Sequence, residues 1–133
     1  MPRPATDNDF QQPQKTVARI GVTGCMGRVG ALVVKELLAH HHVGAALAGG
    51  TVKPNYPDKA DFFITHKPEE LFERSDVVID FTTPEATRQH LWLAAKHRVP
   101  LIVGTTGLDD VMEKERMLPR KPRFYVLPRG VSA

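Results

Sequence analysis

The chain has 133 residues, of which 41% are hydrophobic and 25% are charged, and these values are typical of one globular domain. Its formal net charge of +3 is too small to indicate nucleic acid as a partner, and no basic stripe is interleaved with aromatic residues. The sequence offers neither a secretory signal nor an apolar stretch long enough to span a bilayer, and its single cysteine excludes an internal disulfide. We therefore expect a cytoplasmic protein that does not bind membranes.

The first fifteen residues are polar and contain three prolines and three glutamines. Such a segment buries too little apolar surface to offset the entropy that is lost on ordering. We therefore expect residues 1–15 to be a disordered leader and residues 16–133 to form the folded domain.

The first strong pattern is RIGVTGCMGRVG, residues 19–30. It predicts a buried strand, then a glycine-rich turn, then a helix that opens on that turn. This unit binds a dinucleotide pyrophosphate through main-chain N–H groups at the start of the helix. The residues that define its three parts are, in order, Val17, Ile20 and Val22; Gly24, Gly27 and Gly30; Val33, Val34, Leu37 and Leu38.

The glycine spacing alone also fits a tight turn that binds no ligand, because Met26 stands where the usual motif has its middle glycine. Arg28 favours the interpretation that the turn binds an anionic ligand, since a cation in the first turn of a helix is unfavourable unless an anion lies nearby. Cys25 lies where a helix N-terminus can lower the pKa of a thiol. We interpret Cys25 instead as a small residue that fits the turn.

The second strand is predicted at residues 43–47 (VGAAL). Dinucleotide sites usually carry an acidic residue near the end of this strand, which binds the adenosine ribose. Residues 48–53 contain no acid, and this weakens a preference for NAD. Lys53 fits two roles, contact with the 2′-phosphate of NADP or a solvated position in a loop.

The remaining elements continue the alternation of strand and helix, which predicts a doubly wound parallel sheet with right-handed crossovers. Thr83 is a good N-cap and Pro84 a good first residue for the helix that follows the central strand. The predicted elements are a strand at 60–64, a helix at 68–74, a strand at 77–81, a helix from 84 to about 97, a strand at 101–103, a helix from Asp109 or Asp110 to before Pro119, and a strand at 124–127.

Ligands of open α/β sheets bind beyond the carboxyl ends of the strands. Three such ends carry small or hydroxyl residues, at 24–30, 80–83 and 104–107. Thr105 and Thr106 offer donors and acceptors for a carboxamide or carboxylate, and Thr82 is a candidate ligand contact. We expect Asp80 to hold loop backbone rather than to act as a base.

The segments GCMGRVG (24–30), DFTTPEAT (80–87) and GTTGL (104–108) resemble, in this order and spacing, the 4-hydroxy-tetrahydrodipicolinate reductase family of lysine and diaminopimelate biosynthesis. The resemblance covers residues 19–108 and implies a Rossmann-type, doubly wound and mainly parallel α/β sheet. It implies NADPH or NADH as the cofactor and hydride transfer to an unsaturated cyclic dicarboxylate. The implied cofactor contacts are Gly24, Cys25, Met26, Gly27, Arg28 and Val29 at the pyrophosphate, and Phe81, Thr82, Gly104, Thr105 and Thr106 at the nicotinamide side.

The chain departs from the family pattern at three places. Ala48 and Gly49 stand where the family has an acidic residue, and at residues 128–132, which align with a segment lining the cofactor, Ser132 agrees while Gly130 replaces an asparagine. By the resemblance, a second domain holds the catalytic residues, the substrate site and the tetramer-forming sheet of the family, and we expect these 133 residues not to include it. We therefore expect no catalytic residue and no metal in this chain, and cofactor binding without turnover.

Two other interpretations fit the sequence. One is a stand-alone Rossmann module that binds or senses a nucleotide without chemistry. The other is the cofactor domain of a different amino-acid-pathway dehydrogenase, such as one acting on semialdehydes. The missing active-site cysteine after the cofactor strands weighs against this last reading.

Overall fold

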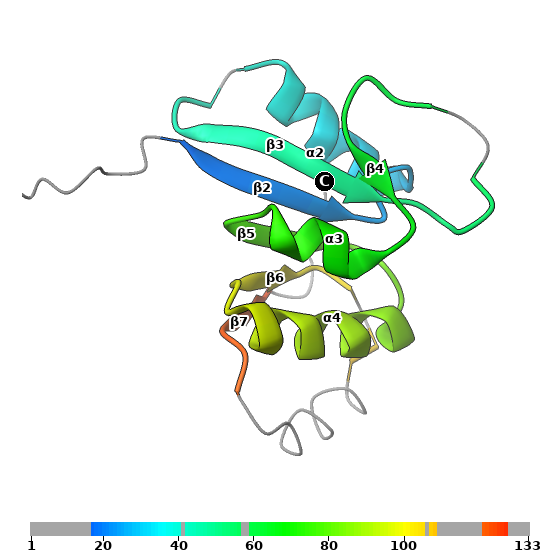
Figure 1. The fold of residues 1–133 in the computed structure, drawn as a ribbon, viewed down its shortest axis with the longest axis vertical. Helices are drawn as coiled ribbons and strands as arrows, with labels where there is room; N and C mark the ends of the chain where they lie inside the picture. The colour runs from blue at the N-terminus through cyan, green and yellow to red at the C-terminus, as the bar shows by residue number, and fades with distance from the viewer. Residues whose placement is uncertain (1–16, 41, 57–58, 106, 109–120, 128–133) are drawn as a thin grey trace, which may run out of the picture.

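The computed structural model describes residues 17–40, 42–56, 59–105, 107–108 and 121–127. Its helices and strands alternate along the chain (Figure 1). The strands are β2 (Ala18–Thr23), β3 (Ala45–Thr51), β4 (Ile64–Thr65), β5 (Val77–Asp80), β6 (Leu101–Val103) and β7 (Phe124–Val126). The helices are α2 (Arg28–Leu38), α3 (Pro68–Glu73) and α4 (Pro84–His97).

The six strands form one sheet in the order β4-β3-β2-β5-β6-β7, and every neighbouring pair is parallel. The chain runs outward from β2 to β4 on one side and then from β5 to β7 on the other. The strand order therefore reverses between β2 and β5, which is the switch point of a doubly wound sheet. This confirms the Rossmann-type α/β fold that the sequence predicts.

Helices cover both faces of the sheet, as parallel strands require. Helix α2 packs on one face, and α3 and α4 lie side by side on the other (Figure 1). Gly21 lets α3 approach closely, because a Cβ at this position would lie 2.8 Å from Leu71 Cγ. The apolar core is divided accordingly; one cluster is centred on Val22, Cys25, Val34 and Leu37, and the other on Leu71, Phe72, Val78, Leu91, Ala94 and Leu101.

Short-range signals placed α4 and its flanking strands correctly. Helix α4 begins at Pro84, and its N-cap Thr83 accepts a hydrogen bond from Ala86 N at 3.3 Å through Oγ1. The helix ends at His97, because Arg98 takes the left-handed conformation with φ 58°. Strands β5 and β6 match the prediction to within one residue.

Strand β3 differs from its prediction, since it begins at Ala45 and continues to Thr51. The prediction ends this strand at Leu47, but the strand continues through Gly49 and Gly50. A Cβ at Gly50 would overlap the Cys25 side chain, and a Cβ at Gly49 would lie 2.8 Å from the Phe63 ring. The two glycines therefore serve close packing rather than strand termination.

The structure also differs from the prediction at two other element boundaries. The strand predicted at residues 60–64 is reduced to β4, Ile64–Thr65. The side chains just before β4 pack instead of continuing the strand: Phe62 contacts the core cluster on the α2 side, and the centroid of the Phe63 ring lies 3.9 Å from Arg74 Cζ. Helix α2 ends at Leu38, before the predicted end at residues 40–42, and His40 follows with φ 60°.

Some predictions fall outside the described residues. They are the leader at 1–15, the helix between residues 109 and 119, Thr106, and the segment at 128–132. Each helix in the described ranges is too short or too polar to cross a lipid bilayer.

Candidate functional site

The glycine turn, residues 24–30, follows β2 and includes the first residues of α2, and it is hydrogen-bonded to the end of β3. The N–H of Gly24 donates to Thr51 Oγ1 at 2.9 Å, and that of Cys25 donates to the Thr51 carbonyl at 3.1 Å. Gly24 has φ 67°, a conformation that strains a residue with a Cβ. A Cβ at Gly30 would overlap the Gly24 carbonyl, so a glycine is required where the helix folds back on the turn.

The first turn of α2 presents unpaired N–H groups. Gly27 is its N-cap, and among the described residues no side chain caps the helix and no acid lies in its first turn. The N–H groups of Arg28, Val29 and Gly30 have no acceptor within an α-helix. Met26, Gly27 and Arg28 are exposed. This uncapped, positive helix end with an exposed arginine fits a pyrophosphate.

Cys25 is structural rather than reactive. Its side chain is 1% exposed and belongs to the core cluster on the α2 side. Burial raises the pKa of its thiol, which outweighs the lowering by a main-chain hydrogen bond. This agrees with the interpretation of Cys25 as a small residue that fits the turn.

The loops after β5 and β6 meet beside the glycine turn. Thr82 N–H donates to Thr105 Oγ1 at 3.0 Å, which joins the two loops. A Cβ at Gly24 would lie 3.0 Å from Thr82 Cγ2, and one at Gly104 would overlap the Phe81 ring. Gly24 and Gly104 thus allow all three strand ends to pack against one another at the carboxyl edge of the sheet.

A buried carboxylate lies directly beneath these loops. Asp80 is fully buried and accepts hydrogen bonds from the hydroxyls of Thr23 at 2.7 Å, Thr82 at 2.5 Å and Thr87 at 2.6 Å. The Nδ1 atom of His90, which is 2% exposed, lies 3.3 Å from Asp80 Oδ1 without the alignment of a hydrogen bond. We call these five residues the Asp80 cluster.

The cluster keeps Asp80 ionised. Burial raises the pKa of this carboxyl. The neighbouring His90 ring and the hydroxyls of Thr82 and Thr87 lower it by a larger amount, so the pKa lies below its ordinary value. The expectation that the Asp80 side chain holds loop backbone is wrong for the contacts described. The Asp80 carbonyl accepts from Gly104 N at 2.8 Å, whereas its carboxylate binds side-chain hydroxyls.

The longer β3 changes the surroundings of the glycine turn. Because Thr51 is the last residue of the strand and bonds to the turn, the exposed Lys53 follows two residues after that contact. The carbonyl of Lys53 accepts from Tyr56 N at 3.0 Å, which makes a tight turn there. Between Ala48 and Lys53 the strand end carries no acid.

The structure therefore gathers most of the predicted site residues at one edge of the sheet. Those described are Gly24, Cys25, Met26, Gly27, Arg28, Val29, Phe81, Thr82, Gly104 and Thr105, and Thr106 lies outside the described residues. Two residues of the site were not predicted: Thr51, which bonds to the glycine turn, and Thr23, which bonds to Asp80 beneath it. Thr51 lies 27 residues from Gly24, so no local pattern connects the two.

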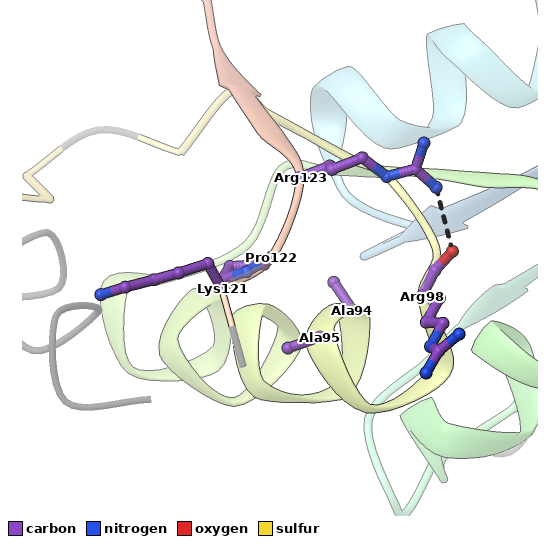
Figure 2. Close-up of a pocket in the computed structure, with 6 residues that line it drawn as sticks. All are labelled: Ala94, Ala95, Arg98, Lys121, Pro122 and Arg123. Carbon is purple, nitrogen blue, oxygen red and sulfur yellow. Dashed lines mark hydrogen bonds between the residues drawn. The ribbon is translucent and has the colours of Figure 1, made fainter. Parts of the chain in front are cut away.

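A pocket of about 410 Å³ lies at the opposite edge of the sheet, between the end of α4 and the start of β7 (Figure 2). Its three cationic residues do not converge, since Lys121 extends away from the two arginines. Arg123 Nη2 donates to the Arg98 carbonyl at 3.2 Å, which ties the end of α4 to β7. This pocket lacks the geometry of an anion site.

A group on α3 and α4 has ligand atoms of the kind that bind metals. The ligand atoms of Glu69, Glu73 and His97 lie within 4.8 Å of one another. Glu69 Oε2 already contacts Lys96 Nζ and His97 Nε2, each at 2.6 Å. Hydrogen bonds from Lys96 and His97 lower the Glu69 pKa, so Glu69 already has partners in a surface network between the two helices.

Comparison with known proteins identifies the family. The sequence profile described as "Dihydrodipicolinate reductase, N-terminus" matches residues 18–118. The 4-hydroxy-tetrahydrodipicolinate reductase of Helicobacter hepaticus is 37% identical over 92 residues, which cover 69% of this chain and 36% of the relative. That of Anaplasma marginale is 37% identical over 103 residues, covering 69% and 39%. The chain thus spans less than half the length of these relatives.

Solved structures share the fold. Dipicolinate-bound dihydrodipicolinate reductase from Paenisporosarcina sp. TG-14 superposes with a TM-score of 0.61 at 22% identity, over 74% of this chain and 41% of that one. A conserved hypothetical protein from Pyrococcus furiosus gives a TM-score of 0.61 at 16% identity, over 84% of this chain and 94% of that one. On the match of its sequence from residue 18 to residue 118, this chain belongs to the dihydrodipicolinate reductase family, whose amino-terminal part it represents.

Proposed function

We propose that the chain binds a nicotinamide dinucleotide, NADPH or NADH, across the carboxyl edge of β2, β5 and β6. The observation that carries this proposal is the uncapped, exposed start of α2 on the glycine turn, packed beside the loops of Thr82 and Thr105. The N–H groups of Arg28 and Val29 and the Arg28 guanidinium would hold the pyrophosphate. Phe81, Thr82 and the loop from Gly104 to Thr106 would adjoin the nicotinamide.

Lys53 is proposed as the residue that meets the 2′-phosphate of NADPH. Thr51 joins the end of β3 to the glycine turn, so Lys53 leaves the strand beside the pyrophosphate end of the site. An acid at this strand end would repel a 2′-phosphate, and residues 48–53 contain none. A cation there attracts this phosphate instead.

Membership of the family supports a proposal for the biological role. The chain would supply the cofactor half of a reductase that transfers hydride to an unsaturated cyclic dicarboxylate in lysine and diaminopimelate biosynthesis. The bound nicotinamide supplies the hydride. This chain's residues would bind and orient the dinucleotide. The two titratable groups of the Asp80 cluster, Asp80 and His90, are buried and so are not placed to donate a proton to a substrate. We accordingly propose that the isolated chain binds cofactor without turnover.

Calorimetric titration of the purified chain with NADPH, NADH and coenzyme A tests the binding proposal. The expected result is measurable binding of a nicotinamide dinucleotide and a loss of at least about tenfold in its affinity in Arg28→Glu, because the new charge opposes both the phosphates and the start of α2. A matched control is Arg88→Glu on the exposed face of α4, which makes the same charge change away from the glycine turn. Equal binding by both variants would contradict the proposed site.

A stand-alone nucleotide-binding module is the second candidate. The observation in its favour is that the Pyrococcus furiosus protein is matched over 94% of its own chain, so this fold exists without a large second domain. The same titration separates the two functions. Binding of coenzyme A in preference to both nicotinamide dinucleotides would support the module and count against the reductase.

A further inference from the structure

The Asp80 cluster joins the three strand ends that form the proposed site. Thr23, which donates to Asp80, is the last residue of β2 and directly precedes the glycine turn. Thr82, a second donor, lies in the loop after β5 and is bonded through its N–H to Thr105 after β6. Through its carbonyl, Asp80 also accepts from Gly104 N. Asp80 thereby contacts the end of β2 and the β5 loop through its carboxylate, and the β6 loop through its main chain.

Stability of the sheet does not explain why a carboxylate is used here. A buried charge costs more free energy than an apolar side chain of similar volume, even when it is well bonded. Strands β2 and β5 are already joined at their opposite ends by Asp76, which accepts from Arg19 N at 2.8 Å. An ionised carboxylate does offer several acceptor positions in a fixed geometry, and Asp80 uses them for hydroxyls from β2, the β5 loop and α4.

We propose that Asp80 is a positioning residue, which holds the glycine turn and the loops of Thr82 and Thr105 in the arrangement that binds the dinucleotide. The proposal rests on the proposed function of the site. Asp80 and Thr23 are both fully buried, so neither touches a ligand at the surface. Because Thr23→Val changes no charge, a loss of cofactor affinity in that variant must be transmitted through the position of the loops.

The expected effect follows from the population of the competent arrangement. When the loops occupy that arrangement for only a fraction of the time, the apparent affinity equals the intrinsic affinity multiplied by that fraction. Asp80→Asn keeps the shape of the side chain but turns one oxygen, which accepts hydroxyl protons, into an amide donor. Thr23→Val removes a single hydroxyl at constant shape, and Thr23→Ser retains it.

Two measurements on the purified full chain test the proposal. The first is amide hydrogen exchange of residues 24–29 and 104–105 without ligand, and the second is NADPH affinity by calorimetry. In Asp80→Asn and Thr23→Val, we expect faster exchange in both segments and an affinity about tenfold lower. Thr23→Ser should restore both. Asp76→Asn is the matched control, because it loosens the same two strands at the end away from the loops and should leave the affinity unchanged.

The outcomes separate the two proposals. If Asp80→Asn does not fold, the comparison of Thr23→Val with Thr23→Ser tests the positioning role. Unchanged exchange in the loops of Thr23→Val would overturn the positioning role, whatever the affinity. Failure of the unmodified chain to bind NADPH or NADH would refute the proposed function, while the exchange data on the ligand-free protein would still show whether the cluster fixes the loops.

Discussion

At the residue scale, two glycines of the turn differ sharply in the space around them. A Cβ at Gly30 would overlap the Gly24 carbonyl, whereas one at Gly27 would lie 3.3 Å from the same oxygen. We expect Gly30→Ala to lower the free energy of unfolding by about 2 kcal/mol, as overpacking against rigid backbone does. Gly27→Ala should cost less than about 1 kcal/mol. Urea denaturation measures both, and equal losses would contradict the packing of α2 on the turn.

Lys53 gives a second prediction at this scale. If this side chain meets the 2′-phosphate, Lys53→Gln should weaken NADPH binding by roughly threefold to fivefold, the size of an exposed and screened ion pair. NADH lacks that phosphate, so its affinity should stay the same. The ratio of the two affinities, measured at low and at high salt, is the readout. A parallel loss for both cofactors would show that Lys53 does not read the phosphate.

The ionised Asp80 makes stability depend on pH. Because its pKa is lower in the folded chain, its contribution is complete above the unfolded-state pKa of about 3.9 and is lost as the pH falls toward the folded value. We expect the free energy of unfolding to decline below about pH 4, and Asp80→Asn to remove part of that decline. Glu69→Gln is the comparison, since Glu69 also has a lowered pKa but is only half-buried, at the surface between α3 and α4. A pH profile unchanged in Asp80→Asn would exclude an ionised Asp80.

At the scale of one element, α4 connects the fold to the site. Its N-cap Thr83 fixes the first turn, and the following turns carry Thr87 and His90 of the Asp80 cluster. We expect Thr83→Ala to cost about 1 kcal/mol of unfolding free energy, the usual value of a lost cap, and Thr83→Ser to recover it. NADPH affinity should not change in either variant. A loss of affinity would mean that Thr83 contacts the ligand, beyond its capping role.

At the scale of the whole molecule, the chain matches only the amino-terminal part of its relatives. We expect ligand binding to appear as stabilisation, of about 2.7 kcal/mol at a NADPH concentration one hundred times Kd. Thermal unfolding followed by circular dichroism measures it. A reductase assay on the same preparation should show no steady-state rate, because hydride transfer needs a substrate held at about 3–3.5 Å from the cofactor. Clear turnover would overturn this expectation.

The sequence by itself determined the order of the elements and the edge of the sheet that carries the site. These follow from short-range patterns, such as the glycines after the first strand and the Thr83-Pro84 start of α4, because local backbone preferences and apolar periodicity act within a few residues. The same locality explains the incorrect end of β3, where Gly49 and Gly50 resemble a strand break to any local reading.

Only the tertiary structure decided how the site is held together. It kept the two glycines in β3 because Cys25 and Phe63 need their space, and it fastened the glycine turn to Thr51. It also placed the Asp80 carboxylate against the Thr23 hydroxyl, from a strand 57 residues earlier. Contacts of this kind join residues that are neighbours only after the sheet has formed, so no spacing along the chain encodes them.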